Sequence, residues 1–128
     1  MSITPQNRMY TKSHEWLETM PDGTIKVGVT HHAQDLMGDM VFVDLPAIGR
    51  TLSAGQDCAV VESVKAASDV YAPVAGTVVA VNERLSSAPE QVNKDPYGEG
   101  WLFQLRPSAP PSGLMDAKAY DALVAAEH

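Results

Sequence analysis

The sequence predicts an all-β fold, a small barrel or sandwich with short helices and one closing helix at the C-terminus. Short runs of alternating or continuously apolar residues recur along the 128-residue chain, as half-buried and buried strands require. Nine glycines and nine prolines separate many of these runs, and both residue types favour turns. Apolar residues with a helical spacing follow near the C-terminus. Many short strands with little helix indicate a small barrel or sandwich.

The first half of the chain contains three predicted strands and a short helix. Residues 10–18 mix aromatic and polar side chains, which we interpret as an edge strand. After the turn sequence Asp22-Gly23, apolar residues alternate with other residues over 25–29 and predict a half-buried strand. Residues 31–38 lose this alternation and predict one helical turn that ends at a glycine. Residues 40–46 are rich in β-branched and aromatic residues and predict another strand.

The middle of the chain predicts a hairpin. Residues 49–57 contain two glycines and are interpreted as a loop with a short strand. Residues 58–63 and 68–74 are two apolar, strand-like runs with Lys65 between them. Residues 77–82 alternate again, after a turn, and predict a further strand.

The C-terminal third predicts less regular structure. Turn residues dominate 86–100, where 89–93 is predicted as a short helix, and 101–106 is predicted as a strand. The proline-rich stretch 107–113 predicts a stiff linker. Asp116 then lies near the start of a predicted helix, where an acid favours the helix dipole. The apolar face of this helix is predicted to contain Ala119, Tyr120, Leu123 and Val124.

Length and charge limit the classes of function. We expect one domain over 1–128, with a flexible N-terminus at 1–9 and a linker plus C-terminal helix at 107–128. A net charge of −7 argues against nucleic acid and anionic membranes as partners, and no apolar run approaches a membrane span. The single cysteine, Cys58, excludes an intrachain disulfide and fits a reducing compartment. We therefore expect a bacterial cytoplasmic protein, or a mitochondrial matrix protein if it is eukaryotic and processed.

Lys65 is the first candidate functional residue. Small and polar residues around it cannot form a core strand, so the chain is expected to turn there and expose the lysine at the tip. A hairpin tip fixes the base of a side chain and leaves its end free. Such a placement suits a group that another enzyme must reach and modify. A solvated turn lysine without a task is the alternative that the single residue leaves open.

Several segments resemble one known family. The stretch "ESVKAASDVYAPVAG" is similar to the lipoate-attachment hairpin of the glycine cleavage H-protein family. The segments "YTKSHEW", "VGVTHHAQDLMGDMVFVDLPAIG" and "VNERLSSAPEQVNKDPYGEGWLFQL" resemble that family in the same order. Separate segments in a fixed order are more specific than one short motif. One difference is His31, where the family pattern leads us to expect an acidic residue.

The resemblance implies a barrel-sandwich hybrid fold and a carrier, rather than an enzyme. It implies lipoate bound covalently through an amide to the Nζ of Lys65. The implied carrier shuttles the aminomethyl group of glycine from the P protein, a glycine decarboxylase, to the T protein, an aminomethyltransferase. It also passes electrons to the L protein, a dihydrolipoamide dehydrogenase. A lipoate ligase or a lipoyl/octanoyl transferase would attach the cofactor.

The resemblance also implies two sets of site residues. The attachment site consists of Lys65 with its neighbours Glu62, Ser63, Val64 and Ala66. A cleft that shelters the loaded arm is expected to involve Ser13, Glu15, His32 and Asp69. The loaded group is a cationic amine that water can hydrolyse, so carboxylates and hydroxyls are expected to line this cleft. Our hypothesis is that Glu15 and Asp69 hold the amine and that Ser13 assists.

Three alternative functions stay open. A biotinyl carrier shares the hairpin, but its lysine typically lies between methionines, whereas Val64 and Ala66 flank Lys65 here. A relay of lipoyl or octanoyl groups to other complexes uses the same carrier chemistry, and an unmodified scaffold would carry no group. We expect no metal site, because the adjacent His31 and His32 diverge on a helix and no further ligand has zinc-like spacing.

Overall fold

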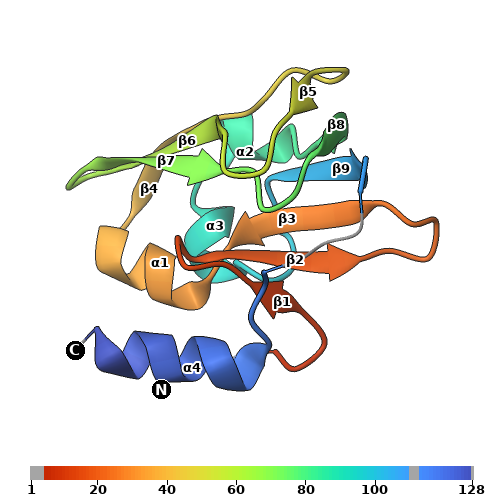
Figure 1. The fold of residues 1–128 in the computed structure, drawn as a ribbon. Coiled ribbons are helices and arrows are strands. Elements are labelled where there is room, and N and C mark those ends of the chain that lie inside the picture. Colours follow the sequence, from red (N-terminus) through yellow and green to blue (C-terminus); the bar gives the residue numbers. More distant parts are fainter. Residues whose placement is uncertain (1–4, 110–112, 128) are drawn as a thin grey trace.

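The computed structural model describes residues 5–109 and 113–127, and within these ranges the strands form two antiparallel sheets. The larger sheet contains, in spatial order, β1 (Met9–Tyr10), β2 (Glu15–Thr19), β3 (Ile25–Val29), β9 (Phe103–Pro107), β8 (Gly76–Val81) and β5 (Thr51–Leu52). The smaller sheet contains β4 (Met40–Asp44), β6 (Asp57–Ser63) and β7 (Ala67–Tyr71). Figure 1 shows the smaller sheet above β2 and β3, so the two sheets form the two layers of the fold. This arrangement confirms the predicted all-β barrel-sandwich class.

In the described part of the chain, four helices accompany the two sheets. They are α1 (His31–Met37), α2 (Arg84–Ser87), α3 (Gln91–Lys94) and α4 (Ala117–Ala126). Helix α4 lies below β1 in Figure 1, away from the smaller sheet. Among the described residues, no helix is long and apolar enough to cross a membrane.

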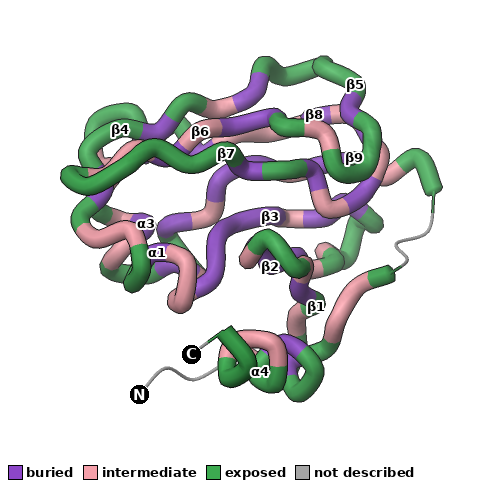
Figure 2. Tube along the Cα trace, turned by 60° about the vertical axis from the view of Figure 1, so that its left-hand side comes forward, coloured by how far each residue is buried: buried purple, intermediate pink, exposed green. Residues whose placement is uncertain are grey.

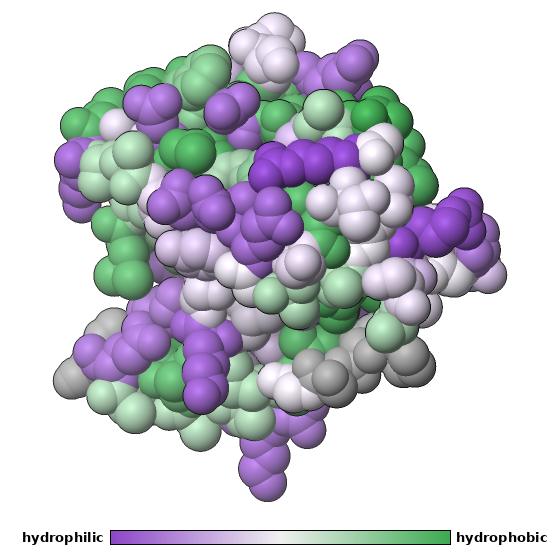
Figure 3. Space-filling model, turned by 45° about the horizontal axis from the view of Figure 1, so that its top comes forward, coloured by the Kyte–Doolittle hydropathy of each residue, from purple (hydrophilic) through white to green (hydrophobic). Residues whose placement is uncertain are grey.

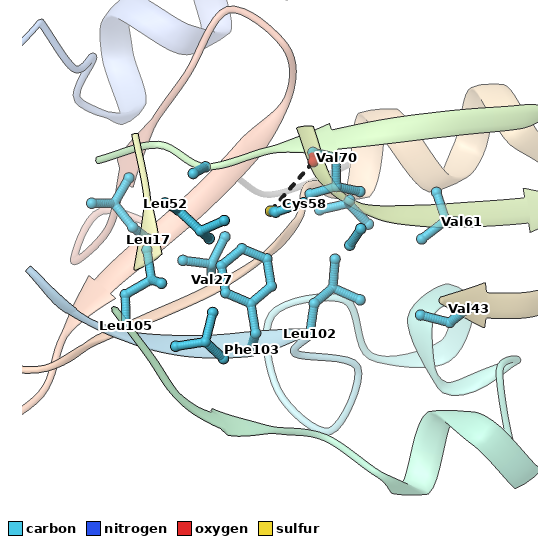
Figure 4. Packing of buried hydrophobic residues seen from close by; sticks show 14 of the residues in the cluster. Leu17, Val27, Val43, Leu52, Cys58, Val61, Val70, Leu102, Phe103 and Leu105 are labelled. Atoms are coloured by element: carbon cyan, nitrogen blue, oxygen red, sulfur yellow. Dashed lines mark hydrogen bonds between the residues drawn. The ribbon is translucent and has the colours of Figure 1, made fainter. Parts of the chain in front are cut away.

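A single core fills the space between the two sheets. Its buried side chains come from strands of both sheets and from α2 and α3, which contribute Leu85 and Val92. Figure 4 shows several of these side chains converging, among them Leu17, Val27, Val61, Val70, Phe103 and Leu105. In β3 the alternation read from the sequence is confirmed, because Ile25 and Val27 are buried against this core. Burying one aliphatic side chain of this size contributes about 1.5–3 kcal/mol to the stability of the fold. The inward residues therefore hold the strands against the core.

Gly28 interrupts the alternation of β3 for a steric reason. A Cβ atom at this position would lie 2.6 Å from Nε1 of Trp16. Gly28 pairs with Trp16 across β2 and β3, and the Trp16 side chain is completely buried. The indole therefore occupies the space above the glycine, and its N–H donates to the carbonyl of Pro96 at 2.8 Å. A residue with a side chain would displace this ring.

A second, smaller cluster fastens the C-terminal helix to the larger sheet. The rings of Tyr10 and Tyr120 stack with their centroids 4.8 Å apart, and Trp16 and Ala117 complete the cluster. The side chain of Asp116 accepts a hydrogen bond from the N–H of Ala119 at 2.8 Å and thereby caps α4. The predicted helix is confirmed, but its buried face contains Ala117, whereas Ala119 is exposed.

The structure differs from the sequence prediction at three other places. The predicted edge strand 10–18 is two strands, β1 and β2, joined by a turn in which the N–H of His14 donates to the carbonyl of Thr11. Helix α2 was not predicted, and α3 begins two residues later than the predicted 89–93.

Part of the N-terminal segment 1–9, for which we expect flexibility, makes defined contacts in the structure. Met9 belongs to β1, and a guanidinium N–H of Arg8 donates to the carbonyl of Tyr97 at 2.7 Å. Residues 1–4 of that segment lie outside the described residues, as do 110–112 of the predicted linker.

Cys58 behaves as a buried apolar residue. Its side chain lies in the core, and its Sγ is 3.4 Å from the carbonyl oxygen of Val70 (Figure 4). Burial raises the pKa of the Cys58 thiol to about 12 from an ordinary value of 9.0. The folded protein therefore keeps the thiol proton under conditions in which the unfolded chain loses it.

We predict that the Cys58 thiol makes the fold less stable as the pH rises from about 9 to about 12. In this window the unfolded state binds fewer protons than the native state, so the free energy of unfolding falls with pH. One such group contributes a slope of about 1.4 kcal/mol per pH unit. Urea denaturation at pH 9.5 and 10.5 should therefore give a smaller loss of stability for Cys58→Ala than for the parent. Parallel losses would contradict the prediction.

Candidate functional site

The turn between β6 and β7 is held by the side chain of Ser63. Its Oγ accepts hydrogen bonds from the backbone N–H groups of Lys65 and Ala66, both at 3.1 Å. The N–H of Ser63 donates to the carbonyl of Ala66 at 2.8 Å and closes the turn. Serine favours turns because its hydroxyl satisfies neighbouring backbone groups in this way. The backbone of Lys65 is therefore fixed on both sides.

The segment between α1 and β4 supports the same turn from a different part of the chain. The N–H of Val64 donates to the carbonyl of Asp39 at 3.0 Å. Gly38 ends α1 with a left-handed φ of 82°, and a Cβ there would lie 3.5 Å from Cε of Lys65. A glycine thus accommodates both the helix end and the lysine stem.

The amino group of Lys65 is accessible and unpaired within the described part of the chain. Lys65 is exposed, and Figure 2 shows the surrounding hairpin tip as exposed tube. None of the ion pairs among the described residues includes Lys65. A lysine with a braced backbone and a free ammonium group presents its nitrogen to an approaching enzyme.

The flanking residues expected at the attachment site have different environments. Val64 is 68% exposed and Ala66 is also exposed, whereas Glu62 and Ser63 are half-buried. Glu62 lies on β6 opposite Ala67 of β7 and Phe42 of β4. The structure therefore brings all four expected neighbours to the tip beside Lys65.

Exposed apolar side chains accompany this tip, and the sequence analysis did not single them out. Leu36, Val41 and Phe42 are 56%, 55% and 51% exposed, and Val64 is exposed beside the lysine. They belong to α1, β4 and the turn, which are the elements that hold Lys65. Elsewhere the surface is mixed, since Figure 3 shows hydrophobic residues among hydrophilic ones on the face it draws. Apolar side chains gathered near one reactive group are typical of a docking surface.

Glu15 is the least expected feature of the candidate cleft because its side chain is almost completely buried. The residue is 1% exposed. Its Oε1 accepts hydrogen bonds from the hydroxyls of Thr11 and Ser13, the latter at 2.6 Å. Its Oε2 accepts the backbone N–H of Tyr71 at 3.2 Å. Among the described residues no lysine or arginine pairs with this carboxylate.

Ser13 and Asp69 come from two different elements near Glu15, the β1–β2 turn and β7. Ser13 is exposed and donates directly to Glu15, as described above. Asp69 is exposed on β7, two residues before Tyr71, whose backbone N–H donates to the other oxygen of Glu15. The contacts that the structure shows therefore join Ser13 to Glu15, whereas Asp69 is near this group only through its place on β7.

His32 belongs to a different group of side chains. Its Nε2 lies 3.4 Å from Oε1 of Glu127, at the end of α4. His14 approaches the other oxygen of Glu127, with 3.3 Å between its Nε2 and Oε2. Burial lowers the pKa of His14 below its ordinary value, against an opposing effect of Glu127. The structure thus joins His32 to His14 and Glu127.

A surface pocket of about 340 Å³ lies away from these residues, in the larger sheet and the 95–101 loop. Its walls carry charges of both signs. It is lined by Arg8, Glu18, Lys26, Asp95, Tyr97, Gly98, Glu99 and Trp101.

Comparison with known proteins identifies the family. The family described as Glycine cleavage H-protein matches residues 8–127. The chain belongs to the glycine cleavage H-protein family. Proteins named glycine cleavage system H protein from Cronobacter sakazakii and an Enterobacter species are 59% and 60% identical to it over 126 residues. Each of these alignments covers 97% of this chain and 98% of the relative.

A solved structure agrees with this assignment. The crystal structure of a glycine cleavage system H protein from Mycobacterium marinum superposes with a TM-score of 0.89 at 41% identity. The superposition covers 94% of this chain and 98% of that one. The expected fold and family are confirmed, and the chain is a lipoyl carrier of the glycine cleavage system rather than a catalyst.

The sequence analysis missed two contributors to the site. Thr11 binds Glu15 from the same turn as Ser13. The turn depends on the left-handed backbone of His14, so no strand alternation in the sequence indicates Thr11. The contact of Glu15 with Tyr71 joins residues 56 positions apart, and no local pattern signals it.

We predict that Ser63→Ala loosens the turn at Lys65. The substitution leaves the N–H groups of Lys65 and Ala66 without their common acceptor, so stability should fall by about 1 kcal/mol. Amide hydrogen exchange at Lys65 should become several-fold faster. Ser68→Ala is the matched control, because the Ser68 hydroxyl reaches only the adjacent carbonyl of Asp69 at 3.5 Å. Equal exchange rates in the two variants would contradict the role given to Ser63.

Proposed function

We propose that Lys65 is the residue that carries lipoate, bound as an amide to its Nζ. The observation that supports this most directly is the combination of a fixed backbone and a free, exposed ammonium group at the tip of the β6–β7 hairpin. When bound, lipoate supplies a dithiolane that accepts and releases both a one-carbon unit and electrons. The chain itself contributes position, because the turn fixes the base of the arm and leaves its end mobile.

The partners that we propose follow from this role. The P, T and L proteins of glycine cleavage would each receive the arm in turn, and a lipoate ligase or lipoyl/octanoyl transferase would attach it. The exposed side chains of Leu36, Phe42 and Val64 beside Lys65 offer an apolar contact for these enzymes. The net charge of −7 favours docking onto basic surfaces and raises association rates. With bacterial relatives of this kind, we propose a bacterial cytoplasmic location and a single domain over 1–128.

We further propose that Glu15 stabilises the cationic amine of the cargo. The carboxylate is buried and surrounded by neutral donors only, so a cation brought to it would gain a charge-assisted hydrogen bond in a poorly solvated place. Ser13 would orient the carboxylate, since it already donates to Oε1. Asp69 would add a second negative charge from the exposed face of β7. His32 lies on the neighbouring helix α1, where its Nε2 is 3.4 Å from the carboxylate of Glu127.

Lys65→Arg should abolish lipoylation. Arginine keeps the positive charge but has no amine that forms the amide, so the fold should remain and the modification should disappear. Intact-mass measurement after expression with lipoate should give one added lipoyl group for the parent and none for the variant. Lys94→Arg, which changes another lysine of the described chain, is the control and should be modified like the parent.

The same measurement separates the alternative functions. A biotinyl mass would replace the lipoyl proposal by a biotin carrier, and an unmodified parent would leave only a scaffold role. Exchange of labelled CO2 into glycine with the P protein then distinguishes glycine cleavage from a pure relay of lipoyl or octanoyl groups. A lipoylated parent that supports no exchange would contradict the glycine cleavage role.

Glu15→Gln should shorten the lifetime of the loaded carrier. The amide keeps an acceptor for Thr11 and Ser13 but removes the charge that would hold the cationic cargo. Formaldehyde released from the loaded protein should appear several-fold faster than from the parent, as measured after removal of the P protein. Glu18→Gln is the control, because Glu18 lies on the same strand and pairs with Arg8 instead. A release rate equal to that of the parent would disprove the sheltering role.

A further inference from the structure

Three side chains from distant parts of the chain meet at the end of α4. His14 belongs to the turn before β2, His32 to the first turn of α1, and Glu127 directly follows α4. The carboxylate of Glu127 lies between the two imidazoles, with its Oε2 3.3 Å from Nε2 of His14 and its Oε1 3.4 Å from Nε2 of His32. One potential ligand atom from each residue lies within 4.8 Å of the other two.

These separations are close to those of a metal-binding site. Zinc binds histidine nitrogen and carboxylate oxygen at about 2.0–2.2 Å, so neighbouring ligand atoms of a tetrahedral site lie about 3.3–3.5 Å apart. The two imidazole–carboxylate distances of 3.3 and 3.4 Å fall in this range before any ion is present. The two imidazole rings are 4.9 Å apart and tilted by 53°, so they do not stack on each other. Small side-chain adjustments would bring all three ligand atoms to one ion.

The His14 imidazole is oriented by a second hydrogen bond. Its Nδ1 lies 2.7 Å from the hydroxyl of Tyr120, and that hydroxyl lies 2.7 Å from Oγ1 of Thr30. Metal-binding histidines usually use their other ring nitrogen in this way, which fixes the ring and the position of the free lone pair. Here the hydrogen bonds from Thr30 to Tyr120 and from Tyr120 to Nδ1 of His14 orient the ring, and Nε2 of His14 faces Glu127.

The backbone at His14 separates this group from the candidate cleft. His14 has a left-handed φ of 70°, which non-glycine residues rarely adopt. The imidazole of His14 contacts the hydroxyl of Tyr120. The carboxylate of the next residue, Glu15, accepts hydrogen bonds from Ser13 and Tyr71 instead. The two neighbouring residues therefore serve two different clusters, and the His14 cluster has no part in holding Lys65.

We propose that His14, His32 and Glu127 bind one divalent transition-metal ion, with Zn²⁺ the best match. Two imidazole nitrogens and a carboxylate are a common zinc ligand set, and water completes the coordination. The ion joins the end of α4 to the β1–β2 turn and to α1. It is separate from the lipoyl site and supplies no chemistry to it.

The test uses the full-length, tag-free chain, produced without lipoate and freed of metal by a chelator. Titration with ZnCl2 by calorimetry should give one equivalent bound, and the melting temperature should rise by several degrees. Co²⁺ should give the visible absorption of a four-coordinate site. Glu127→Gln should weaken Zn²⁺ binding at least tenfold and abolish the shift in melting temperature. Far-UV circular dichroism checks that this variant folds.

Matched controls distinguish this site from other histidines. His31→Gln changes the residue next to His32. The Nδ1 of His31 contacts the side chain of Gln34 and not the cluster, so this variant should bind Zn²⁺ like the parent. His128→Gln changes the C-terminal residue, outside the described residues, and should also bind normally. The proposal is overturned if the parent binds no Zn²⁺, if Glu127→Gln binds as tightly as the parent, or if either control loses the ion.

Discussion

The buried carboxylate of Glu15 connects the two layers of this fold. Removing an ionised carboxylate from water costs several kcal/mol unless hydrogen bonds replace the lost solvent. Thr11 and Ser13 supply such bonds from the turn between β1 and β2, and the N–H of Tyr71 supplies one from the edge of the smaller sheet. The N-terminal turn and β7 are therefore held in one relative position. Among the described residues, no lysine or arginine side chain pairs with this carboxylate.

The lysine tip combines two mechanical properties that a carrier needs. Ser63 and the carbonyl of Asp39 fix the backbone of the turn, so the attachment point does not drift with the loop. The ammonium end is exposed and forms no ion pair among the described residues, so a group attached to it could move freely. A fixed base and a mobile end suit a carrier that serves several enzymes in turn, because only the mobile end must adapt to each enzyme. The apolar side chains beside the turn can serve as a contact shared by those enzymes.

Local patterns predicted the strands better than they predicted the contacts between them. The alternation of 25–29 and the run around Lys65 gave β3 and the β6–β7 hairpin, because each strand buries one face. The split of residues 10–18 into two strands was missed, since it depends on a left-handed residue that is a histidine rather than a glycine. The cluster of His14, His32 and Glu127 was missed because its ends are 113 positions apart in the sequence, and the packing of α4 brings them together.

The position of β7 has a consequence for self-association. It is one of the two edge strands of the smaller sheet, and edge strands offer open backbone groups to which another chain can pair. Here the N–H of Tyr71 is already taken by Glu15, and Ser68 and Asp69 place polar and charged groups along the exposed face. These features make the free edge of β7 a poor template for β-pairing between molecules.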